Sequence, residues 1–296
     1  MARADVTAVT VTLDALPWIE RCLESLRGLE TIVVDHGSVD GTLELVRERF
    51  PDVRVVEQEN TGYGAGLNAG MRVASGRYFL IVNSDAWAVG DAVDRLAAFA
   101  EEHPEVAVVA PRLQNPDGSL QRSVRGFPTL WRLATEYFFM RKLAPRSRLL
   151  NAFYAGDFDH DQAREVEWVM AACFLVRREA TDEVGLFDED FFMFSEEVDW
   201  CRRFGDAGWE VWFAPVADVV HVGGASHGGR LFRENVRGHL RFLAKHRGLR
   251  TAERARMLLR VSLALRGLLF RGERGRQYRD VARWLGTGRV PELLEQ

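Results

Sequence analysis

The sequence predicts an α/β protein, with a mostly parallel sheet flanked by helices and a helical appendage at the C-terminus. Two observations predict this fold class. Over the first 110 residues, short apolar strand patterns alternate with helical patterns, which is the order that builds a parallel sheet covered on both faces. Beyond about residue 250 the composition changes, because arginines accumulate around an apolar stripe of helical period.

Each element is expected where the period of the apolar residues changes. Strands are expected over residues 6–11, 31–34, 53–56, 78–82, 106–110 and 168–176 and near 210–213, and helices from Pro17 and over residues 41–50, 65–74, 91–101 and 129–143. Ligands of such sheets bind beyond the carboxyl ends of the strands. The segments that begin at Asp35, Asn60 and Asn83 are therefore expected to form the binding site.

The chain of 296 residues suits one large domain with an appendage, and we expect a domain over residues 1–248 and a basic helical tail over 249–296. Between Arg250 and Arg289 the tail has eleven arginines and three acids. Its apolar stripe consists of Met257, Leu258, Val261, Leu265, Leu268 and Leu269. Two interpretations stay open: a helix that packs on its own domain with a solvated basic face, and an amphipathic helix over residues 250–285 that lies on an anionic membrane.

The composition excludes several classes of protein. A net charge of −4 gives no reason to expect nucleic acid binding. The three cysteines are far apart and form no C-x-x-C pair, so we expect buried thiols in a reducing compartment. The first residues lead directly into a strand without a signal peptide, and no apolar run reaches the ~18 residues that span a bilayer. We expect a cytoplasmic protein, peripheral at the inner face of the membrane if the tail binds lipid.

Polar segments at two strand ends are candidates for ligand binding. Asn83-Ser84-Asp85 follows the apolar strand 78–82, and a carboxylate there can bind a divalent cation that holds a diphosphate, or it can accept bonds from its own loop. Asp35 ends another strand and begins a glycine-containing turn. This turn matches neither the dinucleotide fingerprint G-x-G-x-x-G nor the phosphate loop G-x-x-x-x-G-K-[ST].

Acidic and histidine side chains follow later in the chain. Glu196, Glu197 and Asp199 lie beside the apolar segment 191–194, where burial can raise a carboxyl pKa and make the group a general base. Acids also favour a helix N-terminus, which is the alternative explanation of this cluster. His221 ends an apolar strand before two glycines, and it is either a core residue or a metal ligand.

Taken in order, these segments resemble glycosyltransferase family 2, the inverting enzymes of the GT-A fold, and within it the bacterial rhamnosyltransferase-like branch. The resemblance extends to about Gly248 and rests on seven blocks in the family's order, namely residues 33–42, 60–70, 83–85, 168–178, 184–193, 196–203 and 221–226. One such block is a weak signal, whereas seven in the same order and spacing are specific.

The resemblance implies a role for each candidate residue. The nucleotide would be lined by Thr12, Asp35, Gly66 and Asn68, the donor diphosphate would be held by the DxD-type segment Asn83, Ser84 and Asp85, and Mn²⁺ or Mg²⁺ would be bound by Asp85 and His221. Glu197 stands where the family has its catalytic base, with Glu196 and Asp199 as alternatives.

The implied reaction moves one sugar, with rhamnose as the candidate, from a dTDP- or UDP-linked donor to a glycan or lipid-linked acceptor in cell-surface polysaccharide synthesis. A single transfer is expected because the Gln-x-x-Arg-Trp motif of processive synthases is absent. A homodimer stays an open expectation.

Three positions depart from the family pattern. Leu13 replaces an aromatic residue, Asn83 replaces the first acid of the DxD-type motif, and Glu197 replaces an aspartate. They motivate the alternative of a non-catalytic sugar-nucleotide-binding protein on the same fold. A nucleotidyltransferase is disfavoured, because the sequence lacks a basic, glycine-rich triphosphate loop.

Overall fold

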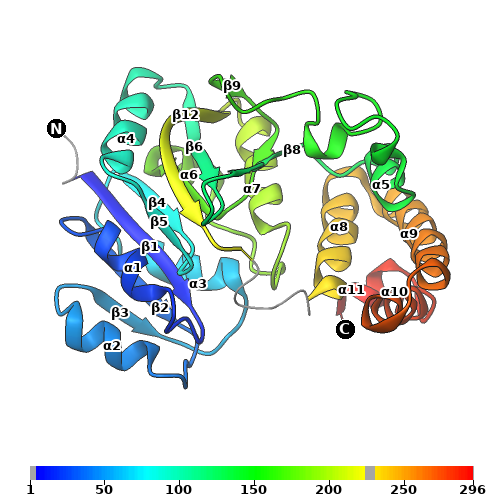
Figure 1. Cartoon of the computed structure of the whole chain (residues 1–296), viewed down its shortest axis with the longest axis horizontal. Helices are drawn as coiled ribbons and strands as arrows, with labels where there is room; N and C mark the ends of the chain where they lie inside the picture. Colours follow the sequence, from blue (N-terminus) through cyan, green and yellow to red (C-terminus); the bar gives the residue numbers. More distant parts are fainter. Residues whose placement is uncertain (1–4, 224–230, 296) are drawn as a thin grey trace.

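A computed structural model describes residues 5–223 and 231–295, and its centre is a twisted mixed sheet (Figure 1). The strands lie in the order β3-β2-β1-β4-β11-β6-β12-β5. Their bounds are β1 Val6–Thr12, β2 Glu30–Asp35, β3 Arg54–Glu57, β4 Tyr78–Val82, β5 Ala86–Ala88, β6 Val106–Gln114, β11 Cys173–Arg177 and β12 Glu210–His221. The strands β1 to β4 are mutually parallel, whereas β11 is antiparallel to both of its neighbours.

Helices cover both faces of this sheet, as the alternating sequence pattern predicts. Along β4, Phe79 and Ile81 contribute to one apolar core, while Leu80 and Val82 contribute to the other. One core receives α3 (Tyr63–Val73), α6 (Arg178–Val184) and α7 (Glu196–Asp206), and the other receives α1 (Ile19–Ser25), α2 (Thr42–Arg49) and α4 (Ala92–Glu102). A period of two along a strand buried on both sides explains the division.

The expected single strand over residues 168–176 is wrong, because the chain changes sheets within it. β10 (Trp168–Val169) pairs with β8 (Val124–Arg125) in a separate two-stranded sheet, and only β11 joins the main sheet. Periodicity does not reveal this break, since both pieces are apolar and buried. The connecting residues Met170, Ala171 and Ala172 cross beneath the carboxyl ends of the central strands, where Ala172 accepts a hydrogen bond from the Asn83 N–H.

Two further elements differ in length from the expectation. The aromatic-rich helix expected over residues 129–143 ends early, as α5 (Leu130–Tyr137) followed by a short 3₁₀ turn. β12 extends eight residues beyond the expected strand, to His221, with a register shift against β6 between Phe213 and Asp218. Pro215 lies within this shift, where a residue without an N–H is tolerated. The extension pairs His221 with Ala86, next to Asp85.

The C-terminal residues form α8 (Phe232–Arg247), α9 (Leu249–Leu269), α10 (Gly272–Trp284) and α11 (Val290–Glu295), which lie with α5 beside the sheet domain (Figure 1). The buried face of α9 consists of Ala252, Ala255, Leu259, Ser262, Leu263, Arg266 and Gly267. Most of the predicted stripe is on the other face and exposed. Among the described helices, none has the length and apolar composition of a membrane span. The domain boundary at residue 248 remains a prediction.

Candidate active site

The carboxyl ends of β1, β4 and β12 meet at one cleft of about 460 Å³. The predicted residues Thr12, Asn83, Ser84, Asp85 and His221 all line it. Glu196 and Glu197, which begin α7, line the same cleft. Residues that are more than 180 positions apart in the sequence therefore face one space, at the sheet edge where α/β proteins bind ligands.

Asp85 and His221 form the polar centre of this cleft. Both are buried, and Asp85 Oδ1 lies 3.4 Å from His221 Nε2. The other Asp85 oxygen accepts a hydrogen bond from the Gly223 N–H. Within residues 5–223 and 231–295, no lysine or arginine forms an ion pair with Asp85, and no cluster of three or more acidic, histidine or cysteine side chains has the geometry of a metal site. Asp85 and His221 are thus two candidate metal ligands that lie together, and no third candidate joins them among the described residues.

A hydrogen-bond chain sets the orientation of the His221 ring. His221 Nδ1 lies 2.7 Å from Gln121 Oε1, which can only accept, so Nδ1 carries the proton. In the neutral imidazole the Nε2 lone pair then faces the Asp85 carboxylate, and Asn83 Nδ2 lies 3.3 Å away. The Tyr63 hydroxyl donates to Asn83 Oδ1 and so fixes that amide. Burial and the neighbouring Glu196 raise the pKa of Tyr63 well above its usual value, which keeps this donor protonated.

Glu196 and Glu197 enter the cleft from a strained turn. Phe194 and Ser195, directly before them, have φ angles of 68° and 72°, in the left-handed region that costs a residue other than glycine ~1–2 kcal/mol. α8 holds this turn closely, since a Cβ on Gly238 would lie 2.7 Å from both the Phe194 carbonyl and Ser195 Oγ. Strain of this kind is retained where packing enforces it, often at functional sites.

Burial perturbs both carboxyl groups, by different amounts. Desolvation raises the pKa of Glu197 to about 7, against the opposing hydrogen bonds from backbone N–H groups at the start of α7. Desolvation and the charge of Glu197 raise the pKa of Glu196 well above its usual value. Burial therefore favours the protonated form of both groups, more strongly for Glu196, and within the described part of the chain each has one buried oxygen without a hydrogen-bond partner.

Asp199 is not brought to the cleft. Its side chain is fully buried on the other side of α7, where Arg203, Lys245 and His246 surround it. Hydrogen bonds from these three groups hold its pKa down at about 2, despite burial. A carboxylate with three cationic or hydrogen-bonding partners binds a proton weakly, so the geometry gives Asp199 a structural role.

Three of the predicted nucleotide-binding residues also act on the protein itself. Asp35 is buried and accepts hydrogen bonds from the Gly37 and Ser38 N–H groups. Asn68 exchanges hydrogen bonds with the backbone of Phe187, across from α3. Gly66 leaves room for a neighbouring ring, since a Cβ there would lie 2.7 Å from His36 Nε2. None of the three lines the cleft, although their neighbour His36 does.

Several lining residues were missed by the sequence analysis. They are His36, Tyr63, Gln121, Arg122 and Arg125. Tyr63 lies inside the segment 60–70 that the family resemblance singled out, and attention to its one aromatic side chain could have identified it. Gln121 and the two arginines come from the irregular connection after β6, where the sequence has no periodic pattern that would indicate a contact with His221.

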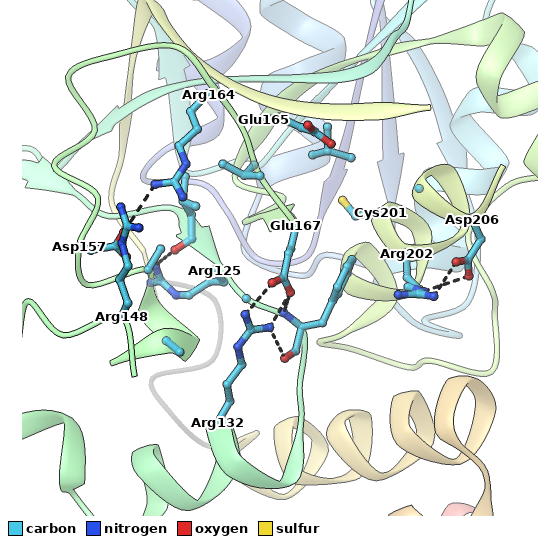
Figure 2. A pocket seen from close by; sticks show the side chains of 18 of the residues that line it. Arg125, Arg132, Arg148, Asp157, Arg164, Glu165, Glu167, Cys201, Arg202 and Asp206 are labelled. Carbon is cyan, nitrogen blue, oxygen red and sulfur yellow. Dashed lines mark hydrogen bonds and ion pairs between the residues drawn. The ribbon is translucent and has the colours of Figure 1, made fainter. Parts of the chain in front are cut away.

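Two other cavities adjoin this region. A cavity of about 310 Å³ borders the cleft and shares Arg125, Met170, Phe194 and Glu197 with it. A larger one, of about 530 Å³, contains none of the predicted site residues (Figure 2). Most of its charged side chains pair among themselves, for example Arg132 with Glu167 and Arg202 with Asp206.

Comparisons with known proteins match this geometry. The model of Glycosyl transferase family 2 matches residues 7–185. An N-acetylglucosaminyl-diphospho-decaprenol L-rhamnosyltransferase of Mycobacterium tuberculosis strain H37Rv is 34% identical, over 88% of this chain and 91% of the relative. The chain belongs to glycosyltransferase family 2. It is thus a glycosyltransferase.

Solved structures support the same fold for this family 2 enzyme. The mannosyltransferase PcManGT of Pyrobaculum calidifontis, in complex with GDP-Man and Mn²⁺, matches with a TM-score of 0.58 at 17% identity. The match covers 100% of this chain and 86% of the mannosyltransferase chain. GalNAc-T7 with UDP, GalNAc and Mn²⁺ has a TM-score of 0.62 at 12% identity, covering 94% of this chain and 55% of its own. At these identities the likeness concerns the GT-A fold alone.

Proposed function

We propose that this enzyme transfers a rhamnosyl group, with inversion, from a dTDP- or UDP-linked donor to a sugar hydroxyl of a lipid-linked diphosphate acceptor in cell-surface polysaccharide synthesis. The observation that carries the proposal is that Asp85 and His221, 3.4 Å apart, and Glu197 line one cleft. The relative from M. tuberculosis, whose name includes a lipid-linked acceptor and rhamnosyl transfer, supports the choice of substrates.

Glu197 is the proposed base. As the acceptor oxygen forms its bond to the anomeric carbon, the hydroxyl proton passes to the Glu197 carboxylate, and the bond from the anomeric carbon to the diphosphate oxygen breaks with its electron pair. A pKa of about 7 suits this step, since a base works best when its pKa is near the working pH. Glu196 stays protonated beside it and does not compete.

A divalent cation, Mn²⁺ or Mg²⁺, fits two residues that line this cleft. His221 Nε2, which can also accept from Asn83 Nδ2, lies 3.4 Å from the Asp85 carboxylate, and imidazole nitrogen and carboxylate oxygen are both metal ligands. Asp85 and His221 would hold the metal, and a bound metal would neutralise charge on the departing diphosphate. Asn83 and Ser84 would contact that diphosphate.

The test is transfer from dTDP-rhamnose to an acceptor with N-acetylglucosamine on a lipid diphosphate, with Mn²⁺ and after chelation. Product is detected by mass spectrometry and nucleoside diphosphate by a coupled assay. We expect chelation and Asp85→Asn to lower the rate by 10²-fold or more, on the order of the effect of losing one transition-state charge contact. The control Asp117→Asn makes the same change in an exposed turn and should leave the rate unchanged. Binding of nucleotide without turnover of any donor would favour the non-catalytic alternative.

We propose in addition that α9 docks on an anionic membrane. Five large apolar side chains on its outer face are 46–79% exposed, namely Met257, Val261, Leu265, Leu268 and Leu269. The exposed arginines Arg250 and Arg254 precede this stripe, and Arg271 and Arg274 follow it. An apolar stripe between cationic ends complements a surface of acyl chains and anionic headgroups, and it would bring the enzyme to a lipid-linked acceptor.

Co-sedimentation with vesicles tests this docking. We expect binding to vesicles that contain phosphatidylglycerol, and roughly 100-fold weaker binding for the double variant Leu268→Ser/Leu269→Ser, since each leucine contributes on the order of 1.5 kcal/mol when buried and ~1.4 kcal/mol corresponds to a factor of ten. The control is Val89→Ser, which also replaces an exposed apolar side chain with serine, but next to β5 and outside the stripe. If the stripe variant instead dissociates a homodimer and vesicle binding is absent throughout, the stripe is a dimer interface.

A further inference from the structure

The 310 Å³ cavity that adjoins the cleft has a wall chemistry that the donor site does not share. Aromatic side chains surround it, from the chain segments near α5, β10 and α8, and they are Tyr137, Phe153, Tyr154, Trp168, Phe194 and Phe232. Glu197 lies at the boundary, since it lines both this cavity and the cleft. The proposed base therefore borders two separate spaces.

Two polar groups in side chains of the cavity wall have no hydrogen-bond partner among residues 5–223 and 231–295. They are Trp168 Nε1 and His239 Nδ1, and the exposed fractions of the two residues are 7% and 5%. Burial lowers the pKa of His239 to about 4, so this imidazole is neutral. Buried donors and acceptors are nearly always paired, and two unpaired groups in one cavity indicate a missing polar ligand or water.

Trp168 shares a sheet face with an arginine of the cavity wall. Trp168 of β10 is paired with Arg125 of β8, so both side chains project from the same face of the two-stranded sheet. Arg125 is half-buried, stacks over Tyr154 and forms no ion pair within the described part of the chain. Both residues line the cavity that Glu197 also borders.

We propose that this aromatic cavity binds the sugar of the acceptor, an N-acetylhexosamine carried on a diphosphate, and that Trp168 and His239 are binding residues for its polar substituents. The inference rests on the proposed function. Inversion requires the acceptor oxygen to approach from the side opposite the leaving diphosphate. Asp85 and His221 are the proposed holders of the diphosphate, and the cavity is lined by Glu197 but by neither of them, as an acceptor site separate from the leaving group would be.

The cavity suits a single sugar ring. Its volume is at the lower end of the range for small-molecule sites, ~300–1,000 Å³. Such sites combine apolar and aromatic walls with a few polar groups that fix orientation, as Trp168 and His239 would do here. The Trp168 N–H can donate to an amide or hydroxyl oxygen, and the neutral His239 can accept from a hydroxyl or donate.

The experiment separates acceptor binding from donor binding in the full-length enzyme. Trp168→Phe keeps the aromatic wall and removes the N–H, and His239→Asn tests the second group. Trp131→Phe is the matched control, because the Trp131 indole is 44% exposed and donates to the Leu149 carbonyl outside the cavity. For each variant we measure kcat/KM for a short-chain alkyl diphosphate of N-acetylglucosamine and the rate of donor hydrolysis by water in the absence of any acceptor.

We expect Trp168→Phe and His239→Asn to lower kcat/KM for the acceptor by about tenfold each, as for one hydrogen bond to a buried group. Donor hydrolysis and the KM for dTDP-rhamnose should stay within twofold of the wild type, and Trp131→Phe should change neither. A fall in donor hydrolysis with the same acceptor kcat/KM would overturn the proposal, because the cavity would then hold the donor sugar.

Unchanged kinetics in both variants would also overturn the proposal and would assign the two unpaired groups to water. The activity of the wild type shows whether the acceptor cavity alone is wrong or the proposed function is wrong as well. A wild type that transfers to the acceptor while the variants are unaffected contradicts only the acceptor cavity. A wild type that hydrolyses dTDP-rhamnose but never transfers to a lipid diphosphate sugar overturns both. If Trp168→Phe does not fold, His239→Asn decides the question alone.

Discussion

Replacing Glu197 with glutamine tests the proposed base with a minimal change of shape. The variant keeps the volume and loses the group that accepts the proton. General-base catalysis contributes on the order of 10²–10⁴ in rate, equivalent to ~3–5 kcal/mol of barrier, and we expect kcat to fall by that factor. Binding of the donor should be little changed, because the substitution leaves Asp85 and His221, the proposed metal ligands, in place.

The pH dependence provides a second readout of the same change. Burial raises the pKa of Glu197 to about 7, and the base must be deprotonated to act. Wild-type kcat/KM should therefore fall about tenfold per pH unit as the pH decreases below about 7. Glu197→Gln should lose this acidic limb together with the activity. A variant within fivefold of the wild type, or one with the same acidic limb, would refute the assignment.

Glu196→Gln is the control for the neighbouring carboxyl. Burial and the charge of Glu197 keep Glu196 protonated, and a glutamine resembles a protonated glutamic acid in shape and charge. We expect activity within a few-fold of the wild type. Strong loss in Glu196→Gln with activity retained in Glu197→Gln would exchange the roles of the two residues.

Three further predictions concern stability and positioning. The Glu196→Gln variant should become more stable relative to the wild type as the pH rises above 4.5. In the wild type, the folded state holds a proton on Glu196 that the unfolded state releases at such pH, so the free energy of unfolding of the wild type decreases. Thermal melts of both proteins from pH 5 to 9 measure this difference. Asp199→Asn should lose ~3–5 kcal/mol of unfolding free energy in urea melts at pH 7, with the specific activity of folded enzyme retained. This contribution of Asp199 is fully present above about pH 4 in the wild type and decreases as pH falls towards the folded pKa of about 2. Gly238→Ala should lower kcat by roughly 10²-fold, because the added methyl displaces the Phe194–Ser195 turn that positions Glu197, whereas donor affinity measured by calorimetry should be retained.

The sequence was sufficient to predict the residues at the strand ends. Apolar runs that end in Thr12, Asp85 and His221 indicate where parallel strands stop, and the rule for open sheets brings those ends together. The network that orients His221 could not be predicted in the same way. It joins Tyr63 to Asn83 and Gln121 to His221 over 20 and 100 positions, and neither contact leaves a periodic signal.

The distinction between Glu196, Glu197 and Asp199 also required the structure. Three acids at a helix start look alike in sequence, and their pKa values depend on what each side chain faces. The left-handed turn at Phe194 and Ser195 directs the first two into the cleft. Asp199, a few positions further along α7, faces α8 and meets Lys245 and His246.

In the tail helix α9, the spacing of the apolar residues correctly predicts a helix but does not show which of its faces is buried. Its large apolar residues were identified from their spacing, which usually marks a buried face. The buried face carries Leu259 and Leu263 among small side chains and Arg266. A Cβ on Gly267 would lie 2.5 Å from Arg279 Cγ, so close packing against α10 depends on this glycine. Large apolar side chains remain outside, where a second surface can bind them.

The two faces of α9 connect the proposals for the acceptor. Arg266 on the inner face lines the aromatic cavity and donates to the Glu136 and Tyr137 carbonyls of α5, while the stripe from Met257 to Leu269 lies on the outer face. A helix with its side chains is ~10 Å thick, so a membrane that contacts the stripe would lie about that far from the cavity wall. A diphosphate between lipid and sugar spans a distance of this order.

If both proposals hold, Leu268→Ser/Leu269→Ser should raise the apparent KM for a long-chain acceptor in anionic vesicles and leave the KM for a short-chain acceptor in solution unchanged. An equal effect on the two acceptors would separate membrane docking from acceptor delivery.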